Sequence, residues 1–144
     1  MSKEGDLLPV KIICHHSATS DGRTFSASAI KRYHTQTLGW DDVGYHCLIE
    51  LVDDDYFAIM GRMWDAPGAH TLGQNSISLG LCFVGNFDTY EPDEEMLITG
   101  AKVVKLWKKL YGIPTSAIHK HSEYANKSCP GKLFPWTHFL MLCN

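Results

Sequence analysis

The stretch Ile77-Ser78-Leu79-Gly80-Leu81-Cys82-Phe83-Val84 is the clearest strand in this chain. Its odd-numbered positions carry large apolar side chains, and most of its even-numbered positions carry very small ones. Such a run is typical of a strand that is covered on both faces. The small side chains allow a helix or a neighbouring backbone to approach closely. We therefore expect residues 77–84 to lie inside a sheet.

Further strands and helices alternate on both sides of this segment. Residues 10–16 are predicted to form a second buried strand, because they are short, apolar and rich in β-branched side chains. Residues 45–51 and 56–60 flank the acidic run 53–55 and are predicted to form a hairpin with a solvated turn. A loop is expected at residues 19–22 and a short strand around residues 116–119.

Three helices are expected. The first covers residues 26–37, with Ser26 as its N-cap and a stripe formed by Ala27, Ile30, Tyr33 and Thr37. The second covers residues 92–111, with acidic residues in its first turn and lysines near its end, and it ends at Gly112. Its expected apolar stripe is formed by Met96, Leu97, Val103, Leu106, Trp107 and Leu110. A last helix begins near residue 135.

Length and composition favour one packed domain. The 144 residues suffice for a single domain, and 44% hydrophobic with 20% charged residues suits a globule. The fold class predicted is α/β, a single domain over residues 1–144 with a mixed, mostly buried central β-sheet flanked by helices. The polar residues 1–8 are expected to be a flexible N-terminal segment. The net charge of −3 does not indicate a nucleic-acid-binding surface, and no apolar run is long enough to insert into a membrane.

Eight histidines and five cysteines are the chemically informative residues. His15 and His16 end the first strand, His119 and His121 end a late one, and Cys129 follows in a loop. Imidazole and thiolate ligands together favour zinc over magnesium or calcium. Neighbours on a strand point to opposite faces, so only one of His15 and His16 can face a given site. The alternative is a set of hydrogen-bonded core histidines beside one buried thiol.

The other cysteines have mostly apolar neighbours. Cys14, Cys47 and Cys82 are expected to be small buried thiols of a chain made in a reducing compartment. Cys143 carries no signal of its own.

Five motifs follow one another along the chain. The first is Ile13-Cys14-His15-His16-Ser17-Ala18-Thr19, and the second is Asp42-Val43-Gly44-Tyr45-His46. The others are Gly61-Arg62 with Gly68-Ala69-His70, the run Asn75–Gly80 with Val84–Phe87, and the segment from His121 to Gly131. In this order the motifs, which cover roughly residues 10 to 136, resemble the zinc-dependent N-acetylmuramoyl-L-alanine amidases, the family that includes small phage lysozyme-type amidases and peptidoglycan recognition proteins.

The resemblance implies one zinc ion per chain, held by His15, His121 and Cys129, and catalytic roles for Tyr45 and Lys127. Two imidazoles and one thiolate leave a fourth position open, as in a catalytic rather than a structural zinc site. Lys127 would stabilise the negative charge that builds on the attacked carbonyl oxygen. Tyr45 would hydrogen-bond either that oxygen or the attacking water.

Substrate contacts are expected from His70, Arg62 and Trp64. Arg62 would meet acidic groups of a muropeptide, and Trp64, like Trp40, would stack on a sugar face. A surface loop for His70, a structural ion pair for Arg62 and core packing for the tryptophans are the alternatives. Glu123 is an alternative general base.

The resemblance leaves His16, His46 and His119 as supporting or packing residues. If His16 or His119 supplied a fourth ligand, the zinc would be structural instead. The sequence departs from the phage enzymes at Ser122 and Asn126, two positions of the closing motif that are not proposed ligands.

The resemblance implies hydrolysis of the amide between N-acetylmuramic acid and L-alanine in peptidoglycan. We expect a monomer that acts as a phage or prophage endolysin. The opening residues 1–6 are polar and no long apolar run follows them, so we expect a chain without a secretory signal, made in the cytoplasm and acting on the cell wall after release through a membrane lesion. The alternatives are a non-catalytic muropeptide-binding module and a cytosolic amidase that recycles muropeptides. Non-catalytic members of the family typically lack the cysteine ligand, which is present here as Cys129.

Overall fold

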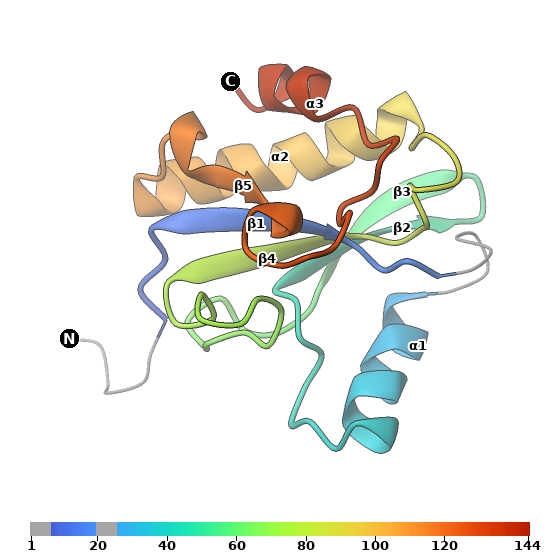
Figure 1. Cartoon of the computed structure of the whole chain (residues 1–144), viewed down its shortest axis with the longest axis vertical. Helices are drawn as coiled ribbons and strands as arrows, with labels where there is room; N and C mark the ends of the chain where they lie inside the picture. Colours follow the sequence, from blue (N-terminus) through green and yellow to red (C-terminus); the bar gives the residue numbers. More distant parts are fainter. Residues whose placement is uncertain (1–6, 20–25) are drawn as a thin grey trace.

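Five strands form one mixed sheet, in the order β3-β2-β4-β1-β5, in the computed structural model, which describes residues 7–19 and 26–144 (Figure 1). The strands are β1 (Lys11–His16), β2 (Cys47–Val52), β3 (Asp55–Met60), β4 (Ser78–Phe83) and β5 (Ile118–Lys120). β1 runs parallel to β4 and β5, β2 runs parallel to β4, and β3 closes one edge antiparallel to β2. The predicted mixed sheet is confirmed, and β4 lies at its centre.

Helices cover both faces of the sheet. Helix α2 (Glu94–Tyr111) and helix α3 (Trp136–Leu142) lie on one face, and helix α1 (Ala27–Arg32) lies on the other (Figure 1). The larger apolar core includes Phe83 on β4, Trp107 on α2 and Phe139 on α3, all fully buried. A smaller cluster places Ile30 of α1 with Leu48 of β2 on the opposite face. Covering both faces buries β1 and β4 along almost their whole length.

The first helix differs from its prediction in its second half. Ser26 caps it as expected, because its hydroxyl accepts the Ala29 N–H at 3.1 Å. After Arg32 the chain continues as a π-helix over Tyr33–Thr37. The buried stripe consists of Ala27, Ile30 and His34, whereas Tyr33 and Thr37, which we expected in it, are exposed. His34 lies four positions after Ile30 and therefore shares its buried face. Because a π-helix has more residues per turn than an α-helix, Tyr33 is rotated away from that face.

The second helix ends as predicted, and four residues of its expected apolar stripe are buried: Met96, Leu97, Val103 and Trp107. Gly112 takes the left-handed conformation (φ 68°) that ends many helices, and its N–H bonds the Lys108 carbonyl. The buried face includes Gly100, Ala101 and Val104, whereas Leu106 and Leu110, which we expected to be buried, are exposed. The small residues let the helix lie close to the sheet: a Cβ on Gly100 would fall 2.5 Å from the Phe83 ring.

Some expectations fall outside the described residues. The loop expected at residues 19–22 lies largely outside them, and so do residues 1–6 of the segment expected to be flexible. Leu7 of that segment is buried, and its N–H donates to the Asp65 carbonyl at 2.7 Å. Within the described ranges, no helix is both long and apolar enough to cross a membrane. The acidic turn 53–55 is fully exposed, as predicted.

Candidate metal centre

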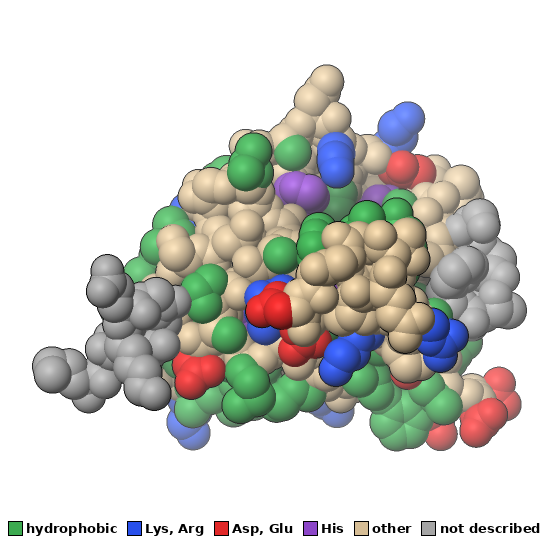
Figure 2. All heavy atoms as spheres, turned by 90° about the horizontal axis from the view of Figure 1, so that it is seen from below, with side chains coloured by type: hydrophobic (Ala, Val, Ile, Leu, Met, Phe, Trp, Pro, Cys, Tyr) green, Lys and Arg blue, Asp and Glu red, His purple; other side chains and the backbone are tan. Residues whose placement is uncertain are grey.

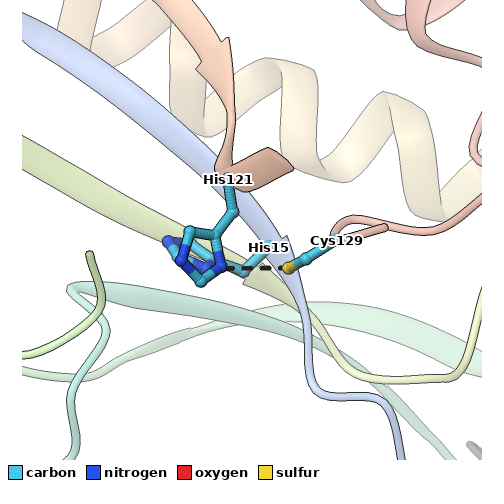
Figure 3. Close-up of side chains that lie close together, drawn as sticks. All are labelled: His15, His121 and Cys129. Carbon is cyan, nitrogen blue, oxygen red and sulfur yellow. Dashed lines mark hydrogen bonds between the residues drawn. The ribbon is translucent and has the colours of Figure 1, made fainter. Parts of the chain in front are cut away.

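One side chain from β1 and two from the C-terminal part of the chain point toward one another at one end of the sheet (Figure 3). A donor atom of each of His15, His121 and Cys129 lies within 4.8 Å of the other two (Figure 3). The Cys129 Sγ and the His15 Nδ1 are 3.8 Å apart, and the rings of His15 and His121 have centroids 4.5 Å apart. The residues expected to bind zinc therefore share one site.

The pairing of β1 with β5 brings the two histidines together. Cys14 lies opposite Lys120 in this parallel pair, so the next residues, His15 within β1 and His121 just after β5, lie side by side. His121 begins a short 3₁₀ helix instead of extending the strand. The sequence left open whether His15 or His16 faces the site, and the structure places His15 there.

The loop that carries Cys129 is fixed by backbone contacts. The His16 N–H donates to the Cys129 Sγ at 3.3 Å, and the Ser122 N–H donates to the Cys129 carbonyl at 2.9 Å. The Asp88 carboxylate accepts from the Ser128 hydroxyl and from the Lys132 N–H, both at 2.8 Å. These contacts hold the thiol in place from both sides of the loop.

Burial sets the charges of the three donors. It lowers the pKa of His15 far below its usual range, and neighbouring cationic and imidazole groups add to the effect. Burial and the Lys127 ammonium also lower the pKa of His121. Both rings are neutral at pH 7, the form in which imidazole binds metals. Burial raises the pKa of the Cys129 thiol to about 11, against the opposing effects of the His16 N–H and Lys127.

The donor set fits a zinc ion. Bond lengths of about 2.1 Å to nitrogen and 2.3 Å to sulfur put the two donors about 3.6 Å apart in a tetrahedral site, close to the 3.8 Å observed. Among the described residues, no fourth histidine, cysteine or carboxylate joins the group. His16 accepts the Phe87 N–H through its Nδ1, and the His119 Nδ1 contacts the Glu123 carboxylate, so neither closes the site. These three donors would leave one position of a tetrahedral zinc ion without a ligand from the described residues.

The three donors lie in the wall of an open cleft of about 500 Å³. Histidine side chains are visible on the face seen from below in Figure 2. Tyr45 and Lys127, which we expected to be catalytic, also line the cleft. The Tyr45 ring lies 5.1 Å from that of His15, and burial raises the pKa of its hydroxyl well above 10. Lys127 lies two residues from Cys129 and is exposed.

The residues expected to contact substrate are placed differently from one another. His70 lines the cleft, but its ring is buried behind His15. Arg62 is buried and donates to the carbonyls of Asp42, Val43 and Pro67, which makes it a tie between loops. Trp64 packs edge-on against Trp107 at 5.6 Å in the larger core. Neither Arg62 nor Trp64 is among the described residues that line the cleft, and the sequence had left these structural roles open.

Two cleft residues were missed by the sequence analysis. His34 lines the wall beside Trp40, with ring centroids 4.6 Å apart, and its Nδ1 accepts the Gly44 N–H. Its spacing from Ala27 and Ile30 placed it on the buried face of the first helix, a signal that was available in the sequence. Asp88 also lines the cleft, but nothing in the sequence singles out this carboxylate. Glu123 does not line the cleft: it accepts the Lys120 N–H instead.

The chain is a single mixed α/β domain with three potential metal ligands, two histidines and one cysteine, in the wall of an open cleft. The chain belongs to the N-acetylmuramoyl-L-alanine amidases, whose family model matches residues 6–132.

Individual relatives agree with this assignment. The chain is 35% identical over 118 residues to a human N-acetylmuramoyl-L-alanine amidase, which covers 77% of this chain and 20% of the human protein. It is 33% identical over 123 residues to the endolysin of Enterobacteria phage K11, which covers 81% and 76% of the two chains. The structure of bumblebee PGRP-SA superposes with a TM-score of 0.79 at 28% identity, over 92% and 83% of the chains. The chain thus spans about a fifth of the human and mouse amidases and most of the phage endolysin.

Proposed function

We propose that this protein is a zinc-dependent amidase that hydrolyses the bond between the lactyl group of N-acetylmuramic acid and the L-alanine of the stem peptide. The observation that carries the proposal is the convergence of His15, His121 and Cys129 within 4.8 Å in the wall of an open cleft. Hydrolysis adds water across the amide, and it leaves a carboxylate on the lactyl group and a free amino group on L-alanine.

The residues around the site suit this reaction. A zinc ion held by the three donors would act as a Lewis acid toward the scissile carbonyl and lower the pKa of water at the open position. Lys127 supplies a positive charge near the carbonyl oxygen, where negative charge builds during attack. Burial, together with the neighbouring Cys82 side chain, raises the pKa of the Tyr45 hydroxyl, so the hydroxyl keeps its proton and would donate a hydrogen bond either to that oxygen or to the attacking water.

The proposed substrate is peptidoglycan or a soluble muropeptide, and we propose that the protein acts as a monomer on the cell wall, as a phage or prophage endolysin. The match to a phage endolysin over most of its length supports this role. The alternative is a module that binds muropeptides without cutting them, since PGRP-SA shares the fold. The presence of Cys129 beside both histidines favours hydrolysis.

Removal and return of the metal test the proposal. The purified protein is treated with a chelator, assayed on peptidoglycan, and assayed again after one equivalent of zinc is added. We expect the chelator to abolish the release of new L-alanine amino groups and zinc to restore it. Zinc-independent release would contradict the metal-based mechanism, and binding of muropeptide without any release would identify a recognition module.

Substitution of Lys127 separates catalysis from metal binding. Lys127→Ala removes a charge that acts on the developing oxyanion, so we expect kcat to fall by about 10²- to 10³-fold, with zinc content unchanged. Lys132→Ala is the matched control, because this exposed lysine lies in the same loop but does not line the cleft. Equal activity of the two variants would exclude the proposed role of Lys127.

A further inference from the structure

A second layer of polar groups lies behind His15, on the side away from the other two donors. The His15 Nε2 lies 3.0 Å from the His70 Nδ1 and 3.3 Å from the Thr71 hydroxyl, and these two partners are 2.9 Å apart. The His15 Nδ1 faces the Cys129 Sγ. The ring of His15 is therefore held between the site in front and the pair His70–Thr71 behind.

The pair itself is firmly held. The Asn75 Oδ1 accepts the backbone N–H groups of His70 and Thr71 at 2.9 and 3.0 Å. The His70 ring also packs against two glycines that leave no space beside it: a Cβ would fall 2.5 Å from the ring at Gly68 and 2.7 Å at Gly80. His70 is 8% exposed. Gly80 of the central strand β4 and Gly68 of a loop thus make room for this ring.

A backbone carbonyl decides which nitrogen of His70 carries the proton. The His70 Nε2 faces the Ser78 carbonyl oxygen at 3.4 Å, and a carbonyl can only accept. A buried imidazole is neutral and carries one ring proton. With that proton on Nε2, the Nδ1 of His70 is an acceptor.

The tautomer of His70 in turn determines the tautomer of His15. Its Nε2 faces an acceptor nitrogen and a hydroxyl, so it carries the proton and donates it. The Nδ1 of His15 then has a free lone pair, which is directed at the site. A metal-binding histidine needs this tautomer, and hydrogen bonds from the other ring nitrogen commonly fix it.

We propose that His70 is a positioning residue, which holds His15 in the ring orientation and tautomer that bind zinc, with Thr71 as its partner. This inference rests on the proposed function, because it assumes a zinc ligand at His15. In this proposal His70 orients the proposed zinc ligand His15 and does not contact the substrate.

Two substitutions test the acceptor role of His70. His70→Asn places an amide oxygen near the position of Nδ1, and His70→Gln places its amide group near that of Nε2. Both are polar and smaller than or similar to histidine, but only the first can accept from His15. His46→Asn is the control, because His46 is a buried histidine that bonds the Gly80 N–H and the Ala66 carbonyl and does not touch the three donors.

The readouts are the zinc dissociation constant, measured by competition with a chelator, and the absorption spectrum of the Co²⁺-substituted protein. We expect His70→Gln to weaken zinc binding by about 10- to 100-fold and to alter the Co²⁺ spectrum. His70→Asn and His46→Asn should stay within a few-fold of the unchanged protein. Equal zinc binding by all variants, or equal loss in both His70 variants, would overturn the inference and leave the proposed function standing. Failure of the unchanged protein to bind zinc would overturn both.

Discussion

Replacing Cys129 with serine is expected to remove both zinc and activity. The thiolate is one of only three donors in the proposed site, and a serine hydroxyl is a poor zinc ligand that would remain protonated. Loss of the metal removes several kcal/mol of transition-state stabilisation, so kcat/KM on peptidoglycan should fall by at least about 10³-fold. Zinc per chain, measured by elemental analysis, should fall from one to near zero.

Cys143→Ser provides the matched control for this change. Cys143 is also a buried free thiol, but it lies at the end of α3 and not in the cleft. A serine there costs stability through burial of a hydroxyl, without touching the donors. If the Cys129 and Cys143 variants kept similar zinc content and activity, the thiolate would have no part in the site.

Much of the sheet could be predicted because its strands are long or strongly patterned. The alternation in residues 77–84 and the β-branched run in 10–16 both become central, parallel strands. The buried faces of the helices were harder to predict than the strands. Which residues a helix buries depends on what it packs against, and small residues such as Gly100 become buried because Phe83 lies opposite. An apolar residue such as Leu110 can then remain exposed.

The three proposed metal ligands could be named from the sequence because motif order and donor chemistry both pointed to them. Spacing along the chain does not show that these residues meet, since Cys129 lies 114 positions after His15. The pairing of β1 with β5 explains how the two histidines come together. The roles of Arg62 and Trp64 could not be predicted. Both residues are close in sequence to residues that line the cleft. The Arg62 side chain, however, points to loop carbonyls such as that of Val43, and the Trp64 side chain packs against Trp107, so other segments decide where each one points. The contact of His70 with His15 could not be predicted either, because the two lie 55 positions apart and only the folded chain brings them together.

The position of Cys129 also depends on a glycine two residues later. Gly131 has φ 124°, a conformation that side chains strongly disfavour, and its Cα faces the backbone of Phe87. A Cβ there would fall 2.5 Å from the Phe87 carbonyl carbon and 2.6 Å from its oxygen. The Leu133 N–H donates to this same oxygen at 2.7 Å. The close approach of the two segments therefore fits only glycine.

Gly131→Ala is expected to destabilise the protein and to weaken the metal site together. Strained backbone and overlap with backbone atoms that cannot rotate away should lower the free energy of unfolding by about 3 kcal/mol or more. Gly73→Ala is the control: it also has positive φ (83°) but open space around its Cα, so its cost is on the order of 1 kcal/mol from strain alone. Urea unfolding of the metal-free variants measures both values, and chelator competition measures zinc binding. Because the clash must move the loop that carries Cys129, only Gly131→Ala should bind zinc more weakly. Equal stability and equal zinc affinity in the two variants would show that this contact does not set the position of the thiol.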